Sequence, residues 1–405
     1  MKENKFKRDK DLLSDQYDKF SYPDPIDDIE HEIKNNNLYI NYDPKYFWNR
    51  LWPEKKFKKE NLNVLVAGCG ANQASVLSYN NPGYSFTGVD ISKESIKNNE
   101  KLIKKHNLKN LLLICEDFRL LNFDKKFDII ISTGVIHHLE NPISALKYFE
   151  KNLKEDGVII LMVYGKFQRY GLNQVKKVFN EINLNQDKDS IISSKKIINN
   201  LHPKHPANIF NISKDINYDS GIIDLLLHKQ EKFYSIEELL DELKDSNLIL
   251  KNVYEEGLKH LTKFFAFNQD IMNKIRLLDP DEKLKLAQIM NWKDGKIEVI
   301  LCKKNNIKNS THYSKLDVFN LYIKYSLDKT YEINDNILKI TNKRTSSIIS
   351  FNLPKHFNLD SLKNLLSGQK LVKNFFENNN NTYDLFNFLI ENALIDFSFH
   401  PFKKN

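Results

Sequence analysis

Short apolar runs alternate with amphipathic segments between residues 62 and 164. Helical patterns cover Ala74–Tyr79, Lys93–His106 and Pro142–Leu153. Near-continuous apolar strands separated by helices are typical of a parallel sheet that is covered on both faces. The pattern therefore predicts a doubly wound α/β domain. Its expected strands are Leu62–Ala67, Ser85–Asp90, Leu111–Cys115, Phe127–Ser132 and Gly157–Tyr164.

The alternation is interrupted after Tyr164 and returns near residue 233. Residues 165–232 contain helical patterns and the loop "LHPKHPAN" but no clear strand. Ser235 followed by Glu238 three positions later predicts a capping box at the start of the next helix. Strands are then expected at Leu248–Tyr254 and within "KIEVILCKK" at 296–304, after a helical stretch at 281–290. The prediction is a Rossmann-like, mostly parallel, seven-stranded sheet with a helical insertion.

Segments of different character flank this α/β pattern. Residues 1–60 are polar except for "YINYDPKYFWNRLWP" at 39–53, where Pro44 and Pro53 bracket a short helical piece. Residues 305–405 combine short strand patterns, "TYEINDNILKIT" and "SSIISFNLP", with apolar residues at helical spacing from Leu362 to Leu389. They predict a small α+β, winged-helix-like module. "LKEDG" at 153–157 predicts a helix end followed by Gly157 and a strand.

Composition narrows the class of protein. A chain of 405 residues is too long for one ordinary core, so at least two units are expected. No apolar run approaches the roughly 20 residues that span a bilayer, and the N-terminus lacks a secretory apolar region. Three scattered cysteines predict a reduced, cytoplasmic protein without a disulfide framework or zinc site. The net charge of +8 comes from scattered lysines, so nucleic acid is not the expected partner.

The first strand ends in a turn with almost no side-chain bulk, Gly68-Cys69-Gly70. Glycine permits a tight turn and lets a ligand approach the backbone. Asp90 ends the next strand, where a carboxylate can accept hydrogen bonds from both ribose hydroxyls. Two cofactor classes share this arrangement, a dinucleotide and S-adenosylmethionine. Gln73 stands where a dinucleotide fingerprint has its third glycine, which favours the cofactor without a phosphate.

The motifs that follow decide between these cofactors by resemblance. The chain resembles class I S-adenosylmethionine-dependent methyltransferases over about residues 60–303, and "LMVYGKFQRYGL" and "LLLHKQEKFYSIEELLDEL" resemble a bacterial subgroup of them. The resemblance reaches neither the first 40 residues nor the last hundred with any specificity. The motifs that carry it are "VLVAGCGANQA", "TGVD", "CEDF" and "FDIIISTGVIHHLENPISALKYFEKNLKEDGVIILMVYG".

The resemblance implies a cofactor site that is assigned residue by residue. Gly68 and Gly70 would lie along the methionyl group and Asp90 on the ribose. Gln73 would either bind the cofactor's carboxylate or simply start its helix. The remaining implied contacts are Ile91 and Phe118 on the adenine, Asp117 at the adenine amine with Glu116 beside it, and Thr133 with Gly134 beneath the sulfonium.

Methyl transfer from a sulfonium is an in-line displacement that needs a base only when the acceptor is protonated. His137 and His138 are the candidate bases, because histidine titrates near neutral pH. Adjacent helical residues diverge by about 100°, so at most one faces the site. The resemblance implies that His137 lies near its mouth. Tyr164, Arg169 and Tyr170 are the expected acceptor-recognition residues. The histidines of "HPKHP" lack a carboxylate pattern, so no metal site is expected.

The sequence therefore predicts an S-adenosylmethionine-dependent methyltransferase acting on a small molecule, a peptide or a protein. The expected organisation is an N-terminal helical cap at 1–60, a methyltransferase domain at 61–304 whose 165–232 insertion covers the substrate, and the module at 305–405. Three alternatives stay open: an NAD-dependent oxidoreductase, a non-catalytic methyltransferase-derived binding module, and a methyltransferase acting on nucleic acid. "STGV" at 132–135 replaces the tetrapeptide of aminopurine methyltransferases, which argues against DNA adenine as the target. Neither the acceptor atom nor the oligomeric state is indicated.

Overall fold

The computed structural model describes two compact units. The first unit comprises Met1–Tyr46, Lys58–Lys251 and Trp292–Ile307, and the second comprises Phe47–Phe57, Asn252–Asn291 and Lys308–Asn405. Each unit is considered by itself below. The described residues are 13–35, 42–209, 215–253, 269–290 and 295–305, together with 322–325, 329–335, 337–342, 348–353, 360, 362–363, 370–371 and 395–398.

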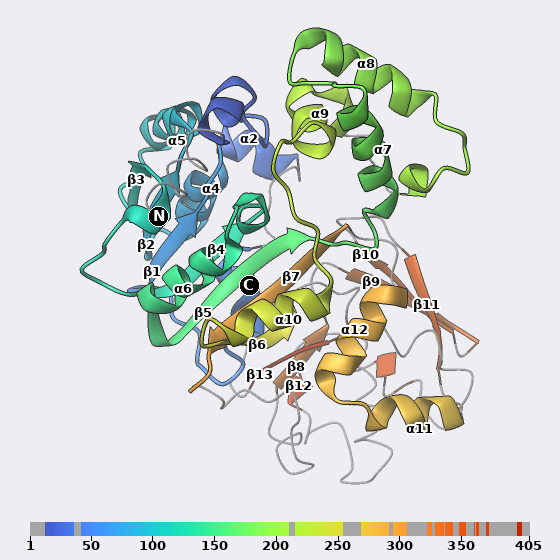
Figure 1. Cartoon of the computed structure of the whole chain (residues 1–405). Helices are drawn as coiled ribbons and strands as arrows, with labels where there is room; N and C mark the ends of the chain where they lie inside the picture. The colour runs from blue at the N-terminus through green and yellow to red at the C-terminus, as the bar shows by residue number, and fades with distance from the viewer. Residues whose placement is uncertain are drawn as a thin grey trace. The chain divides into compact units, whose positions relative to one another are not determined.

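A seven-stranded sheet with the order β3-β2-β1-β4-β5-β7-β6 dominates the first unit (Figure 1). Strands β1 to β5 pair in parallel, and β7 runs antiparallel to β5. Strand order therefore reverses beside β1, between β2 and β4. The predicted Rossmann-like, mostly parallel sheet is confirmed. Its strands are β1 Asn63–Ala67, β2 Ser85–Asp90, β3 Leu111–Cys115, β4 Phe127–Thr133, β5 Leu153–Tyr164, β6 Leu248–Val253 and β7 Lys296–Lys303.

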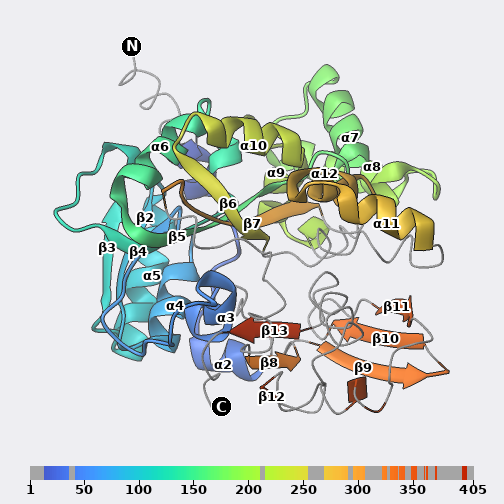
Figure 2. The ribbon, with the colours of Figure 1, turned by 90° about the horizontal axis from the view of Figure 1, so that it is seen from below.

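Helices cover both faces of this sheet, which explains its apolar strands. Helices α4 (Gln73–Asn80) and α5 (Lys93–His106) lie on one face, and α6 (Pro142–Asn152) and α10 (Ile236–Lys244) lie on the other (Figures 1 and 2). Because helices pack on both faces of the sheet, the side chains on both faces of the central strands are apolar. The predicted capping box is present at α10, where Ser235 and Glu238 bond reciprocally. The fully buried strand residues include Val64, Leu65, Val66, Ile129, Ile130, Ile131, Ile159 and Ile160.

Strand β5 begins four residues earlier than its sequence indicates. "LKEDG" predicts a helix end, but α6 stops at Asn152 and Leu153 already pairs with Phe127. The polar residues are accommodated by charges on neighbouring strands: Lys154 lies 2.8 Å from Asp128, and Glu155 lies 2.8 Å from Lys303. The register shifts between Phe127 and Ile129 opposite this segment. The predicted helix end was wrong because these ion pairs are invisible to local sequence patterns.

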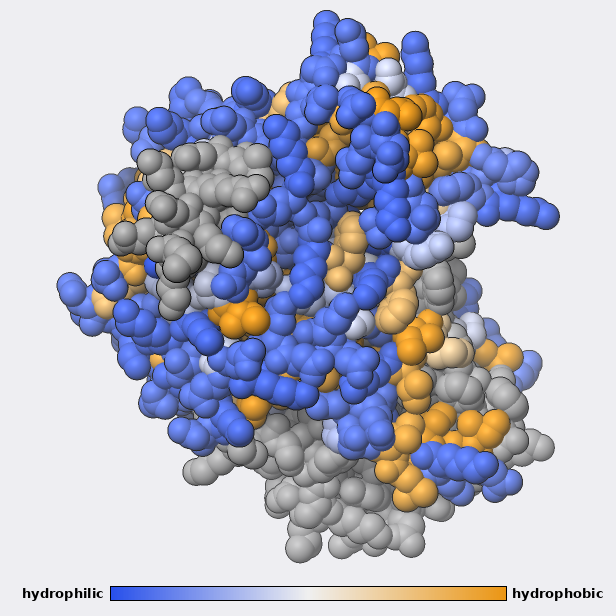
Figure 3. Space-filling view, in the orientation of Figure 1, coloured by the Kyte–Doolittle hydropathy of each residue, from blue (hydrophilic) through white to orange (hydrophobic). Residues whose placement is uncertain are grey.

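The insertion after β5 forms a small helical body. Helices α7 (Tyr170–Glu181), α8 (Lys188–Asn199) and α9 (Asp219–Leu226) share a core that includes Phe179, Ile191 and Ile222. Figure 3 shows apolar side chains gathered over this body, and its exposed large residues include Val178, Ile182 and Ile192. The helical character predicted for 165–232 is therefore present in the described part of that segment.

The N-terminal segment packs on α4 and α5. It contains a helix at 13–19 and α2 (Ile29–Lys34). Ile29 is fully buried against Val76 and Leu102. Asn72, at the start of α4, donates to Asp24 O over 2.8 Å and accepts from Ile26 N over 3.0 Å. These bonds fix the segment beside the carboxyl edge of the sheet.

The second unit contains helices and short antiparallel strands. The predicted strands near 330–341 and 346–354 are present, as β9, β10 and β11, which form one antiparallel sheet. The helices predicted between 361 and 394 fall almost entirely outside the described residues, so the winged-helix-like form stays a prediction. Within the described part of the chain, no helix has the length and apolar character to cross a membrane. The elements are α3 Pro44–Leu51 (which starts in the first unit), α11 Gln269–Leu277, α12 Pro280–Met290, β8 Tyr322–Tyr325, β9 Lys329–Asn334, β10 Ile337–Asn342, β11 Ile348–Asn352, β12 Lys370–Leu371 and β13 Ile395–Ser398.

Candidate cofactor and acceptor site

The turn after β1 adopts a backbone that favours glycine. Gly68 has a φ of +74° and Gly70 a φ of +53°. The N–H groups of Gly68 and Cys69 both donate to Val89 O, over 2.8 and 3.0 Å. A Cβ at position 68 would lie only 2.3 Å from Val135 Cγ2. The absence of side-chain bulk in "AGCG" is therefore required by the turn itself as well as by any ligand against it.

Asp90 holds this turn from the neighbouring strand. Its carboxylate accepts from Gly70 N over 2.8 Å and from Ser92 N over 2.9 Å. Burial raises the pKa of the Asp90 carboxyl above its ordinary value. Each carboxylate oxygen keeps a further acceptor site, so the side chain can also bind two hydroxyls of a ribose.

A cavity of about 720 Å³ lies along the carboxyl edge of the sheet, where the strand order reverses. This is the position at which open α/β sheets bind ligands. The structure brings all the sequence-predicted cofactor residues together on its wall. They are Gly68, Gly70, Gln73, Asp90, Ile91, Glu116, Asp117, Phe118 and Thr133, with Gly134 beside them.

Gln73 both starts α4 and lines the cavity, so the two interpretations of this residue are compatible. Its Oε1 accepts from Thr133 Oγ1 over 3.1 Å. This bond links the beginning of α4 to the end of β4. The side-chain amide nitrogen of Gln73 is then the group that could reach a carboxylate in the cavity.

Asp117 is engaged more strongly with the protein than the sequence indicates. Arg119 Nη2 lies 2.6 Å from Asp117 Oδ2, and the side chains of the two residues are 2% and 4% exposed. Asp117 Oδ1 also accepts from Arg119 N over 2.9 Å. Phe118, which lies between these two residues in the sequence, is buried and packs on Phe149, with ring centroids 5.2 Å apart. An adenine amine would have to share the Asp117 carboxylate with Arg119.

The N-terminal segment supplies cavity residues that the sequence does not reveal. Tyr17, Tyr22, Pro23 and Asp24 all line the cavity. Asp18 Oδ1 accepts from Ser92 Oγ over 2.8 Å and so ties the segment to the residue that caps α5. The polar composition of residues 1–60 predicts a helical cap, but it does not predict which residues the cap contacts. These contacts join positions more than 40 residues apart, so no local pattern marks them.

The structure places His138, rather than His137, on the cavity wall. His137 is fully buried, with its ring centroid 4.1 Å from those of His138 and Tyr164. Burial lowers the pKa of both imidazoles below the ordinary value. Our expectation that at most one of them faces the site agrees with this arrangement, but the residue that does so is His138.

Two of the three predicted acceptor residues line the cavity. Tyr164 donates to Asp224 Oδ2 over 2.9 Å, and the Arg169 guanidinium lies 3.4 Å from the Tyr164 ring centroid. Arg169 Nε also donates to Gly295 O over 2.8 Å. Tyr170, by contrast, is 51% exposed and does not line the cavity.

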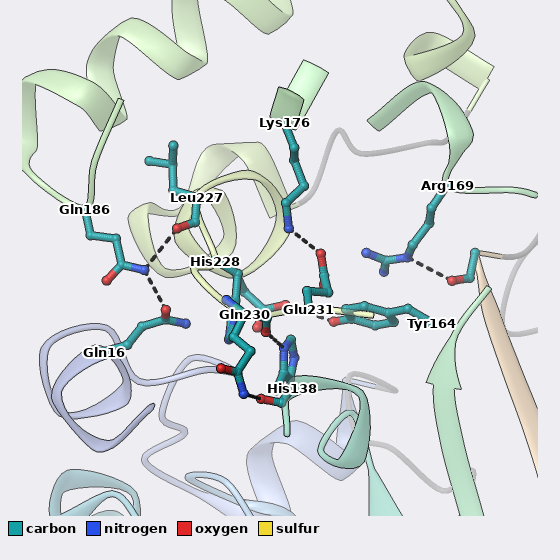
Figure 4. Close-up of polar contacts among 12 residues, drawn as sticks. Gln16, His138, Tyr164, Arg169, Lys176, Gln186, Leu227, His228, Gln230 and Glu231 are labelled. Atoms are coloured by element: carbon teal, nitrogen blue, oxygen red, sulfur yellow. Dashed lines mark hydrogen bonds and ion pairs between the residues drawn. The ribbon is translucent and has the colours of Figure 1, made fainter. Parts of the chain in front are cut away.

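A buried polar cluster occupies the same end of the cavity (Figure 4). Tyr17 donates to Asp224 Oδ1 over 3.2 Å, and His228 Nε2 lies 3.3 Å from the Tyr17 hydroxyl. The His228 ring stacks on His138 with centroids 3.8 Å apart. Sequence reasoning missed Asp224, which lines the cavity, and His228, which stacks on His138. The available signal was "DLLLHKQEKFY", which lies partly in the segment that resembles the bacterial subgroup.

Two sets of side chains in this cluster bring ligand-type atoms within 4.8 Å of one another, His138–Asp224–His228 and His137–His138–Glu231. Some of these groups are engaged in hydrogen bonds or an ion pair. His228 Nδ1 accepts from Gln230 N over 3.1 Å, which leaves its proton on Nε2. Glu231 is paired with Lys176, whose charge opposes a cation. In the "HPKHP" loop, the histidines accept backbone bonds from Lys204 and Ala207.

Comparison with known proteins agrees with this geometry. Residues 58–255 match the family model described as a methyltransferase domain. A malonyl-[acyl-carrier protein] O-methyltransferase of Ilyobacter polytropus is 28% identical over 36% of this chain and 56% of its own length. A tRNA U34 carboxymethyltransferase of Nautilia profundicola is 29% identical over 32% of this chain and 43% of its own. The matched part of this chain thus covers about half the length of each of these two relatives.

Among solved structures, PKMT2 from Rickettsia typhi in complex with AdoHcy superposes with a TM-score of 0.61 and 15% sequence identity. The match covers 89% of this chain and 75% of that protein, and at this identity it establishes the fold. Together with the family match, the sheet order and the glycine turn at the carboxyl edge, it shows a Rossmann-like methyltransferase fold. The segment from 58 to 255 matches the methyltransferase domain of the family model.

Proposed function

We propose that the chain transfers a methyl group from S-adenosylmethionine to an acceptor bound at the Asp224–His138 end of the cavity. The observation that carries this proposal is the convergence of every predicted cofactor residue on one cavity where the strand order reverses. The cofactor would lie across the Gly68–Gly70 turn and leave its sulfonium near Thr133. The acceptor would approach from the side of Tyr164.

The residues of the chain suit each part of this cofactor. Asp90 would accept from the ribose hydroxyls, and the apolar side chains of Ile91 and Phe118 would enclose the adenine. Gln73 would donate to the carboxylate of the aminoacyl group. The cofactor supplies an activated methyl group, so the protein mainly aligns the reactants, which can contribute roughly 7–11 kcal/mol.

The helical insertion would form the acceptor wall. Tyr218, Ser220, Gly221 and Asp224 come from the insertion and line the cavity. We therefore propose that residues 165–232 cover the acceptor, within a methyltransferase domain at 61–304 and apart from a C-terminal module at 305–405. The acceptor is a small molecule, a peptide or a protein side chain. The relatives that we compared carry names with different acceptors, so they do not choose among these.

A labelled-methyl transfer assay tests this function. The full chain is incubated with S-adenosyl-[methyl-³H]methionine and a cell extract, beside the Asp90→Asn variant. As a matched control, Asp128→Asn changes a carboxylate that accepts from Asn63 N and Lys154 but does not line the cavity. We expect labelled product from the wild type and the control, and S-adenosylhomocysteine binding about 10- to 100-fold weaker in Asp90→Asn, since bonds to a charged acceptor contribute about 1.5–3 kcal/mol.

Each failure of this assay has a distinct meaning. Unchanged S-adenosylhomocysteine affinity in Asp90→Asn would overturn the cofactor site. Tight binding without any labelled product would favour a non-catalytic binding module. The circular dichroism spectra of both variants report whether either substitution disturbs the fold.

A further inference from the structure

Residues 13–26, called the strap below, lie against the glycine turn. A Cβ on Gly70 would be only 3.3 Å from Tyr22 O and 3.4 Å from Pro23 Cδ. A cofactor along the Gly68–Gly70 turn would therefore contact the strap as well as the edge of the sheet. The strap residues that line the cavity are Leu13, Tyr17, Tyr22, Pro23, Asp24 and Ile26.

One side of the strap is bonded to the cofactor end of the cavity. Asp18 Oδ1 accepts from Ser92 Oγ over 2.8 Å, and the backbone N–H of Ser92 donates to Asp90 Oδ1 over 2.9 Å. Asn72, which lines the cavity at the start of α4, donates to Asp24 O over 2.8 Å. The strap is thus attached beside the two features that would hold the cofactor, the Asp90 carboxylate and the glycine turn.

The other side of the strap is bonded to the helical insertion. Two of these bonds reach α9, whose Ser220 and Asp224 line the acceptor end of the cavity. A third bond joins the side chains of Gln16 and Gln186 (Figure 4). The three hydrogen bonds run from Tyr17 Oη to Asp224 Oδ1 over 3.2 Å, from Ser220 Oγ to Asp24 Oδ1 over 2.5 Å, and from Gln186 Nε2 to Gln16 Oε1 over 2.5 Å.

The bonds to the two sides come from the same residues of the strap or from neighbours. Tyr17 bonds to the insertion, while the adjacent Asp18 bonds to the residue that caps α5. Asp24 uses its carbonyl oxygen toward Asn72 and its carboxylate toward Ser220. Because the attachment points coincide, lifting the strap from the cofactor wall would also withdraw its bonds from the insertion.

We propose that the strap is a positioning element through which a bound cofactor builds the acceptor end of the cavity. This inference rests on the proposed methyltransferase function. Contacts with the cofactor hold the strap on the glycine turn, and the strap in turn holds α9 in place as the acceptor wall. Each bond to the insertion is weak by itself, since it replaces a bond to water, so the wall loosens when the cofactor is absent. S-adenosylmethionine therefore binds before the acceptor.

Hydrogen–deuterium exchange followed by mass spectrometry tests this link in the full chain, with S-adenosylhomocysteine as the probe. The probe should slow exchange in residues 68–77, which it contacts, and also in residues 13–26 and 216–228, which contain the strap and α9. We expect the slowing in 216–228 to be about 5- to 150-fold, the range by which coupled sites affect one another. The half-saturating concentration of the probe should be the same for all three segments.

The test variant is Gln16→Ala/Tyr17→Phe/Ser220→Ala, which removes the three side-chain bonds between the strap and the insertion. It keeps Asp18 and Asp24, so the strap stays attached to the cofactor wall. S-adenosylhomocysteine should still slow exchange in 13–26 but no longer in 216–228. Transfer of labelled methyl to acceptors of a cell extract should be at least about fivefold slower, because the acceptor meets a loosened wall.

The matched control is Tyr79→Phe/Lys105→Ala, which removes two bonds that join the N-terminal segment to α4 and α5 instead of to the insertion. Tyr79 donates to Glu30 Oε1 over 2.9 Å, and Lys105 Nζ donates to Asp27 O over 2.9 Å. Neither Tyr79 nor Lys105 lines the cavity. This variant should keep both the protection of 216–228 by S-adenosylhomocysteine and the wild-type rate of methyl transfer.

The outcomes separate this inference from the proposed function. Protection of 216–228 in the triple variant as strong as in the wild type, or an unchanged rate of transfer, would overturn the link through the strap. If that variant does not fold, the wild type decides: protection of 13–26 without 216–228, or different half-saturating concentrations in the two, would overturn the inference. Coupled protection without any labelled product would support the link and count against methyl transfer. Absence of S-adenosylhomocysteine binding would overturn both.

Discussion

The substitution Gly68→Ala tests why the turn after β1 requires glycine at this position. The φ of +74° makes any L side chain strained there, by about 1–2 kcal/mol. A Cβ would also lie 2.3 Å from Val135 Cγ2 and 2.9 Å from Cγ1, and such overpacking costs about 1–3 kcal/mol more. We therefore expect a loss of about 2–5 kcal/mol in the free energy of unfolding. Gly70→Ala should lose only the smaller, conformational part, since its nearest contacts are 3.3 and 3.4 Å away.

A double-mutant cycle separates the clash from the strain. Val135→Ala removes both methyl groups that a Cβ at position 68 would meet, so Gly68→Ala/Val135→Ala should recover the overpacking part and keep the conformational part. Guanidinium unfolding followed by far-ultraviolet circular dichroism gives the four free energies. Equal stability of Gly68→Ala and the wild type, or no coupling between positions 68 and 135, would refute this explanation of the turn.

Three further predictions concern the buried polar groups and a helix end. Arg119→Leu should lower the free energy of unfolding by about 3–5 kcal/mol, because it leaves the Asp117 carboxylate buried without its partner; urea unfolding measures this, and a loss under 1 kcal/mol would contradict it. Ser235→Ala should cost about 1 kcal/mol by the same method, since it removes the capping bond to Glu238 N, and no loss would show that the box is unimportant. His137, His138 and His228 all have a pKa lowered by burial, so the unfolded chain binds more protons just below pH 6.5. Stability should therefore fall as pH drops from 6.5, by up to about 1.4 kcal/mol per pH unit for each histidine; calorimetry at several pH values that showed no decline would contradict their burial as neutral groups.

Local signals in the sequence predicted the framework of the domain. Ser85–Asp90 and Lys93–His106 begin and end where the sequence places them, because an apolar run and a strong amphipathic period are each read within a few residues. The sequence predicts a helix end at "LKEDG", residues 153–157, because the strand character of this segment depends on Asp128 and Lys303, which are distant in sequence.

The sequence brings the residues around the glycine turn to one edge of the sheet, but it does not reveal the contacts at the Asp224–His138 end of the cavity. Gly68 and Asp90 follow from strand ends and turn chemistry, so the sequence alone brings them to one edge of the sheet. The Tyr17–Asp224 bond joins residues 207 positions apart, and no local pattern marks either partner. Only the structure shows that the cavity is lined by His138 and not by His137, because the His138 ring is positioned by a hydrogen bond to Gln230, which is distant in sequence.

Calorimetric titration of the full chain with S-adenosylhomocysteine, beside NADH, tests the central claim most directly. The glycine turn, Asp90 and the cavity at the carboxyl edge predict one molecule of S-adenosylhomocysteine bound per chain, with binding weakened in Asp90→Asn and kept in Asp128→Asn. NADH should give no heat of binding. Binding of NADH without binding of S-adenosylhomocysteine would contradict the account and favour a nicotinamide-dependent oxidoreductase.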